Sequence, residues 1–220
     1  MNYEKFKFSP ISWDKVTTDH IGLCYSNDFL GKDIEVPVDR IEANKIGFPK
    51  DYPIATHAWI ILKTDVDKTI NRTHGLWFLK KSETFVLKAG VAYVFEETVS
   101  GVQISIAKEK YGNATNIEIL SRVTPLTSEQ IQKLEDEIIK GWIESVAYGW
   151  LNFPDQIWHV ITGHDIVNYV KGSEICSGYD AHCINQAVAP AKDFLSDADT
   201  NPFEIQISNI WSRDLNVQPV

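Results

Sequence analysis

The apolar segment Thr56-His57-Ala58-Trp59-Ile60-Ile61-Leu62 decides the fold class of this chain. Its β-branched, aromatic and small residues are typical of a buried β-strand. Similar short segments follow, and turn residues such as Ala89-Gly90 and Ser100-Gly101 separate them. The predicted strands are 58–63, 75–80, 84–88, 91–96, 102–107 and 117–123, with a turn at 81–82. Since short connections join antiparallel neighbours, the pattern predicts an antiparallel meander.

The sequence on either side of this region predicts fewer strands. Residues 1–54 are irregular and rich in proline breaks, with short strands expected at 21–25 and 33–38. Near the C-terminus, the segment 203–210 reads as one more strand.

Three segments have helical patterns. The longest is predicted over 128–148, where Thr127 and Gln130 fit a capping box. Its apolar residues are spaced by three and four, and they are Ile131, Leu134, Ile138, Trp142 and Val146. A second helix is expected over 154–161, and a third begins near Cys176 and ends before Pro190. Strands followed by helices indicate an α+β fold.

Composition narrows the class of protein. The chain has 220 residues, of which 44% are hydrophobic, enough for a single domain over 1–220. A formal net charge of −9 argues against nucleic acid as a partner. No segment has the length and apolarity of a membrane span or a secretory leader, so we expect a cytoplasmic protein by default. A secreted protein whose leader has been removed would show the same sequence features.

Cys176 is the residue most suited to chemistry. It lies in Glu174-Ile175-Cys176-Ser177-Gly178-Tyr179, at the predicted start of a helix, where the helix dipole stabilises a thiolate. A buried, inert cysteine is the alternative reading. Cys24 and Cys183 complete an odd set without a disulfide framework, and Cys183 reads as a core residue.

His57, at the start of its strand, is a candidate general base for that thiol. A hydrogen-bonded structural histidine is the alternative. Glu96 and Glu97 end a later strand, and because strand side chains alternate, only one of them can face His57 and orient its ring. The other histidines lack ligand spacing, so we expect no metal and no cofactor.

The order of these motifs resembles the circularly permuted, NlpC-type, papain-like cysteine hydrolases. The motifs are a strand opening Thr-His-Ala, then Val-Phe-Glu before a Gly-Val turn, then a long helix ending Tyr-Gly-Trp, and Ile-Cys-Ser at a helix start. Relatives of lecithin:retinol acyltransferase share this layout. The similarity spans about residues 18–210, which would be the core of the papain-like domain. The resemblance implies a permuted papain-like fold, in which an antiparallel sheet packs against the helix that carries the cysteine.

The resemblance also implies roles for individual residues. Cys176 would be the nucleophile, with Ser177 beside it, and His57 would be the general base. Glu96 would orient the imidazole, with Glu97 as its substitute.

One motif departs from the family pattern. Where the family has Gly-Asp-Ile near its N-terminus, this chain has Thr18-Asp19-His20-Ile21, in which Asp19 would keep the acidic role. The implied reaction is cleavage of an amide or ester acyl bond through a thioester, on a peptide, amide or lipid acyl substrate. A catalytically inactive module that binds a peptide or lipid is the alternative.

Overall fold

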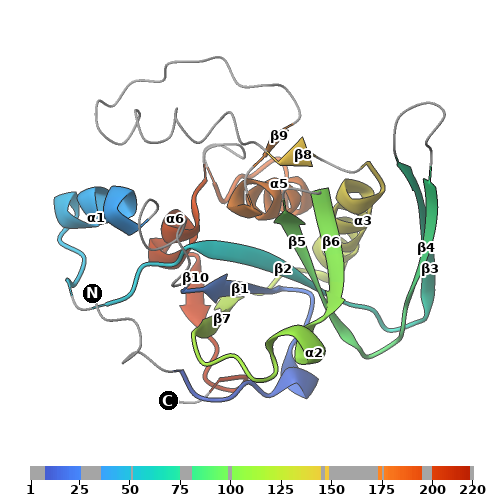
Figure 1. Cartoon of the computed structure of the whole chain (residues 1–220), viewed down its shortest axis with the longest axis horizontal. Coiled ribbons are helices and arrows are strands. Elements are labelled where there is room, and N and C mark those ends of the chain that lie inside the picture. The colour runs from blue at the N-terminus through green and yellow to red at the C-terminus, as the bar shows by residue number, and fades with distance from the viewer. Residues whose placement is uncertain are drawn as a thin grey trace.

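The computed structural model describes residues 8–25, 36–50, 52–74, 81–98, 101–144, 147–148, 173–174, 176–194 and 200–218. These residues form a mixed α+β fold around a six-stranded sheet in which every neighbouring pair is antiparallel (Figure 1). The strands follow the spatial order β10 (Trp211–Arg213), β7 (Ile117–Arg122), β1 (His20–Cys24), β2 (His57–Lys63), β5 (Ala92–Thr98) and β6 (Gly101–Ile106). The α+β class and the antiparallel sheet predicted from sequence are therefore confirmed.

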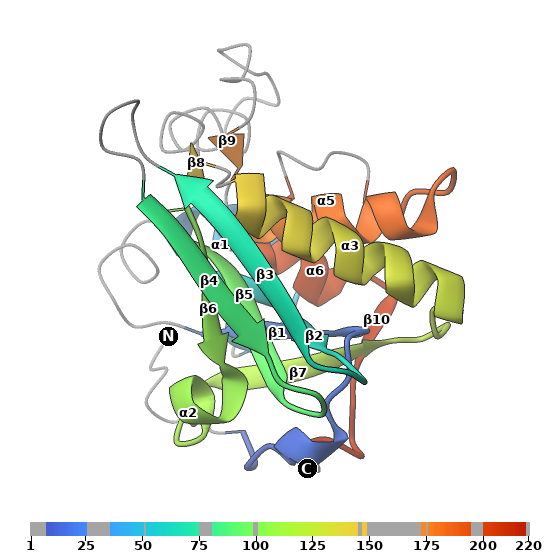
Figure 2. The ribbon, with the colours of Figure 1, turned by 90° about the vertical axis from the view of Figure 1, so that its right-hand side faces the viewer.

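A separate hairpin stands beside the sheet. It consists of β3 (Lys68–His74) and β4 (Lys81–Leu87), and it runs along α3 (Ser128–Glu144) in Figure 2. Arg72 fixes this position, because its buried guanidinium donates to Glu83 and to the carbonyl of Val102 in β6 and lies over the ring of Trp142. The hairpin therefore joins the sheet to the long helix.

Two helices, α3 and α5 (Cys176–Val188), pack against each other and against the sheet. Gly141 allows their close approach, since a Cβ there would lie 2.4 Å from the ring of Tyr179. The Tyr179 hydroxyl donates to the carbonyl of Ile138 at 2.8 Å. The remaining helical elements are η2 (Trp13–Lys15), α1 (Val36–Lys45), α2 (Ala107–Tyr111) and α6 (Pro202–Ile207), and β8 (Ala147–Tyr148) pairs in parallel with β9 (Ser173–Glu174).

The sheet separates two apolar cores. Because strand side chains alternate, β2 sends Ala58 and Ile60 to one face and Trp59 and Ile61 to the other. The first face packs against α3 and α5, whereas the second packs against η2, α2 and residues near the C-terminus. We call these the helical face and the Trp59 face.

Most predicted elements on the described residues are confirmed. Strands occupy the regions predicted at 21–25, 58–63, 84–88, 91–96, 102–107 and 117–123. The capping box is present, since Gln130 N–H donates to the Thr127 hydroxyl and Thr127 N–H donates to the Gln130 side chain. The cysteine helix ends at Val188, before Pro190. The predictions for 75–80 and 154–161 lie outside the described residues.

Several predictions were wrong. A helix begins at Val36 inside the strand predicted at 33–38, where Pro37 suits a helix start. Segment 203–210 begins as α6 because Asn201 and Glu204 form a capping box around Pro202. The long helix ends at Glu144 rather than 148.

Two departures concern the meander. The turn expected at 81–82 is the first part of β4. Strand β3, too polar to be recognised, pairs with β4 outside the main sheet, so β2 pairs instead with β5. Among the helices that the structure describes, none is long and apolar enough to cross a bilayer.

We predict that Gly22→Ala destabilises the protein by about 1–3 kcal/mol, because overpacking displaces a core side chain. Gly22 lies opposite Trp59 in the sheet, and a Cβ there would lie 2.2 Å from the indole ring. Urea unfolding measures the change. The exposed Val123→Ala serves as a control and should stay within about 0.5 kcal/mol of the wild type. Equal stabilities for the two variants would contradict this packing.

Candidate functional site

His57 and Glu96 contact each other on the Trp59 face. His57 Nε2 lies 3.0 Å from Glu96 Oε2. The register of β2 and β5 accounts for this contact: Ile60 lies opposite Phe95, so Glu96 comes opposite Trp59 and diagonal to His57. An ionised carboxylate only accepts hydrogen bonds, so Nε2 carries the proton, and Nδ1 is the acceptor of the neutral ring.

Glu96 is buried, and α2 supplies two of its partners. The Tyr111 hydroxyl donates to Oε2 at 3.1 Å, and Lys110 Nζ makes an ion pair with Oε1. Tyr111 is itself held by stacking on Trp59, with ring centroids 4.8 Å apart and planes 9° apart. A buried carboxylate is costly without such partners, and these donors orient it toward His57.

Glu97 takes the opposite direction. It follows Glu96 in the same strand, so its side chain points to the helical face together with Phe95, and it is also buried. Of the two adjacent carboxylates, Glu96 is the one that orients the imidazole of His57.

Cys176 is the first residue of α5, as predicted, and its side chain lies outside the described residues. Its helix contacts β2 and β5 through the helical face, where Cys183 and Ile184 belong to the same core as Ile60. His57 projects to the other face. The Cys176 thiol therefore cannot reach the imidazole through the sheet. A contact would have to form at the end of β2 where His57 begins the strand.

Ser177, the neighbour of Cys176, has a structural contact. Its side chain is fully buried, and its hydroxyl donates to the carbonyl of Thr200 at 2.5 Å. The bond ties the start of α5 to the residue that precedes the α6 cap.

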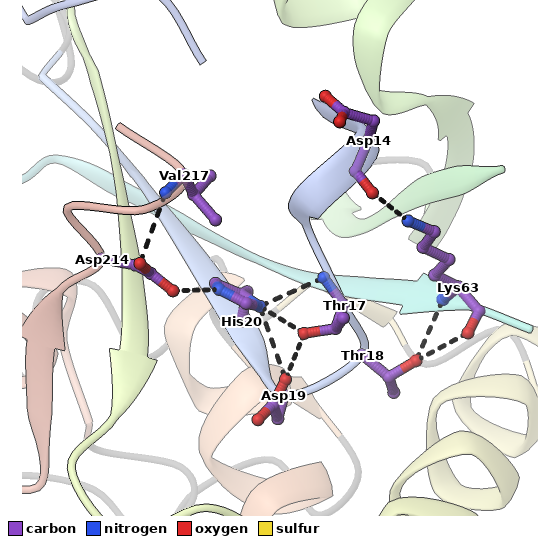
Figure 3. Close-up of polar contacts among 8 residues, drawn as sticks. All are labelled: Asp14, Thr17, Thr18, Asp19, His20, Lys63, Asp214 and Val217. Carbon is purple, nitrogen blue, oxygen red and sulfur yellow. Dashed lines mark hydrogen bonds and ion pairs between the residues drawn. The ribbon is translucent and has the colours of Figure 1, made fainter. Parts of the chain in front are cut away.

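Asp19 belongs to a second polar cluster at the opposite end of β1 from His57 (Figure 3). It accepts from the Thr17 hydroxyl at 2.5 Å and pairs with Nδ1 of the buried His20 at 3.4 Å. His20 Nε2 lies 2.9 Å from Asp214, near the C-terminus. Since Cys24, not Asp19, pairs with His57 across the strands, the structure does not bring Asp19 into the His57 site.

This cluster shifts the pKa of each member. Burial lowers the pKa of His20, but hydrogen bonds and charges from Asp19 and Asp214 outweigh it and raise the pKa above the ordinary 6.5. The hydrogen bond with His20 lowers the pKa of Asp19 to about 2. Burial raises the pKa of Asp214, and the same histidine reverses that effect and lowers it. The two carboxylates therefore favour protonation of the imidazole between them, whereas the backbone N–H of Thr17, which donates to Nδ1 at 3.1 Å, favours the neutral ring.

A cleft of about 380 Å³ opens between η2 and the strands β5 and β6. It lies beside Val91 and Ala92, at the beginning of β5, whereas Glu96 stands near the end of that strand. The cleft is therefore separate from the His57 site.

Sequence reasoning did not identify Lys110, Tyr111, His20 or Asp214. Lys110 and Tyr111 belong to a five-residue helix, which is too short to show an apolar period. The contact between His20 and Asp214 joins positions 194 residues apart, and no local sequence pattern predicts such a pair.

No family model, no curated protein and no solved structure matches this chain.

We predict that Tyr111→Phe costs about 1.5–3 kcal/mol of stability, the usual effect of losing a hydrogen bond to a charged group. The substitution keeps the ring that stacks on Trp59, so the loss reports the hydroxyl alone. A double-mutant cycle with Glu96→Gln, followed by urea unfolding, gives the coupling energy. Additivity within about 0.5 kcal/mol would show that the two side chains do not interact.

We predict that the stability contributed by His20 depends on pH. Since its pKa is raised in the folded state, the contribution is complete below the unfolded value of about 6.5 and disappears as pH rises through the folded pKa. The free energy of unfolding lost in His20→Gln should be largest near about pH 5 and smaller near about pH 8.5. A loss that is constant or grows with pH would contradict the charged cluster. His182→Gln, at a partly exposed site, is the control.

Proposed function

We propose that this protein is a cysteine hydrolase of the permuted papain-like type, with Cys176 as nucleophile, His57 as base and Glu96 as the group that orients the base. The contact of 3.0 Å between His57 and the buried Glu96 carries the proposal. It joins a strand-opening histidine to the end of a later strand, which is the pairing that the motif resemblance implies. The position of Cys176 at the first turn of α5 supports it, because the first N–H groups of a helix lack partners inside the helix.

In the proposed reaction, the Cys176 sulfur attacks the carbonyl carbon of an amide or ester while His57 Nδ1 takes the thiol proton. The C–N or C–O bond then breaks, and the leaving amine or alcohol receives that proton. Water attacks the resulting thioester, again with His57 as base, and the sulfur regains its proton. The backbone N–H of Cys176 would donate to the developing oxyanion. Glu96 stays ionised and holds the ring throughout.

A non-catalytic module that binds a peptide or lipid is the second candidate. One observation favours it: the packed residues of α5 and the imidazole of His57 belong to opposite faces of the sheet. The two candidates differ in the reactivity of Cys176.

We predict that p-nitrophenyl acetate, a small acyl donor, acetylates Cys176 and is turned over. Cys176→Ala should lower turnover at least about a thousand-fold, as loss of a nucleophile does. Glu96→Gln should lower it less, because the imidazole remains but is poorly oriented. Release of p-nitrophenol and the mass of the cysteine-bearing peptide are the measurements.

The control is Cys183→Ser, which removes the other thiol of the same helix, on the helical face. This variant should keep the turnover of the wild type when the assay temperature of each protein is chosen so that the two are equally stable. Turnover that survives in Cys176→Ala, or absence of an acetyl group on Cys176 in the wild type, would contradict Cys176 as the nucleophile, and absence of turnover by the wild type would favour the binding module.

A further inference from the structure

Cys24 lies on the same face of the sheet as the His57 site. It ends β1 directly opposite His57, and directly opposed side chains have Cβ atoms about 4.5–5.5 Å apart. Both residues project to the Trp59 face, since Cys24 packs in that core and His57 contacts Glu96 there. The described structure therefore places Cys24, a different cysteine from Cys176, opposite His57 and on the face to which its imidazole projects.

Two groups on this face favour a thiolate at Cys24. The indole N–H of Trp59 donates to the Cys24 sulfur at 3.1 Å, and a donor to the charged form of a group stabilises that form. Lys110 is the second. Burial lowers the pKa of its ammonium, and attraction to the Cys24 sulfur offsets part of that lowering. A nearby cation is the usual means by which proteins activate a thiol.

The tautomer of His57 supplies the proton acceptor. Its Nε2–H is directed to Glu96, which leaves Nδ1 with a lone pair. The side chain of His57 is 27% exposed, so this end of the strand pair opens to solvent. Cys24 itself is 8% exposed, which restricts its reaction partners to small molecules.

We propose that Cys24 is a second nucleophilic thiol, which transfers its proton to His57 and adds to small soft electrophiles of the α,β-unsaturated amide class. The sulfur forms a bond to the β-carbon while the carbon–carbon π bond breaks. The α-carbon then receives the proton from the imidazolium, so the addition has no leaving group and needs no oxidant. The inference does not require Cys176 to be reactive.

The test is labelling by acrylamide near neutral pH, with each cysteine followed separately by peptide mass spectrometry. Cys24 should label at least about tenfold faster than the buried Cys183, and His57→Ala should slow Cys24 at least about tenfold. The direction in which His57→Ala changes the labelling rate of Cys24 decides between a base and a shield. If His57 only shields the sulfur, its removal opens access and labelling becomes faster, which would overturn the proposal.

Lys110→Gln is the second variant, and it guards against unfolding of His57→Ala. Its side chain is 36% exposed, but it also pairs with the buried Glu96, so the stability of the variant is measured by urea unfolding and labelling is compared under conditions in which it is folded. It should slow Cys24 about threefold, because the stabilising charge is lost. Faster labelling of Cys183 in any variant reports opening of the core, and in that case Lys110→Gln decides. An unchanged Cys24 rate in Lys110→Gln, with Cys183 still protected, would overturn the proposal.

The same data separate this inference from the hydrolase. If His57→Ala slows Cys24 but not Cys176, the inference stands and the proposed catalytic base is wrong. If it slows Cys176 alone, the hydrolase stands and Cys24 is an ordinary core cysteine.

Discussion

The alternation of side chains along β2 is the constraint on which the rest of the structure depends. Ala58 and Ile60 enter a core built with α3 and α5, and Trp59 and Ile61 enter a second core on the other side of the sheet. A shift of one residue would exchange the two sets, so burial of both faces fixes the register. The direction of His57 follows from that register, because the first residue of a strand obeys the same alternation as the residues after it.

The buried Glu96 carboxylate explains why α2 is present at this point of the chain. A charge removed from water needs several donors close by, such as a hydroxyl and an ammonium. The turn of helix after β6 supplies both through Tyr111 and Lys110. The stack of Tyr111 on Trp59 fixes the angle of that helix. The apolar core and the polar site are thus built on the same side chain, Trp59.

Local patterns predicted the parts of the structure that local interactions determine. The strand at His57, the capping box of α3 and the helix at Cys176 each depend on a few adjacent residues, and each was predictable. The strand prediction for segment 203–210 was wrong because its apolar residues suit a strand, whereas the cap at Asn201 favours a helix. Only the family resemblance predicts Glu96 rather than Glu97, because the phase of alternation depends on strand pairing. The pair of His20 with Asp214 joins the two ends of the chain and has no local signal.

A single imidazole nitrogen limits the chemistry available at this site. With Nε2 directed to Glu96, only Nδ1 can accept a proton, so His57 can activate one thiol at a time. Cys24 lies opposite His57 across the strand pair, on the face where the ring lies. Cys176 would approach from the start of a helix that packs on the other face. The geometry around Nδ1 therefore determines which thiol the Glu96–His57 pair activates.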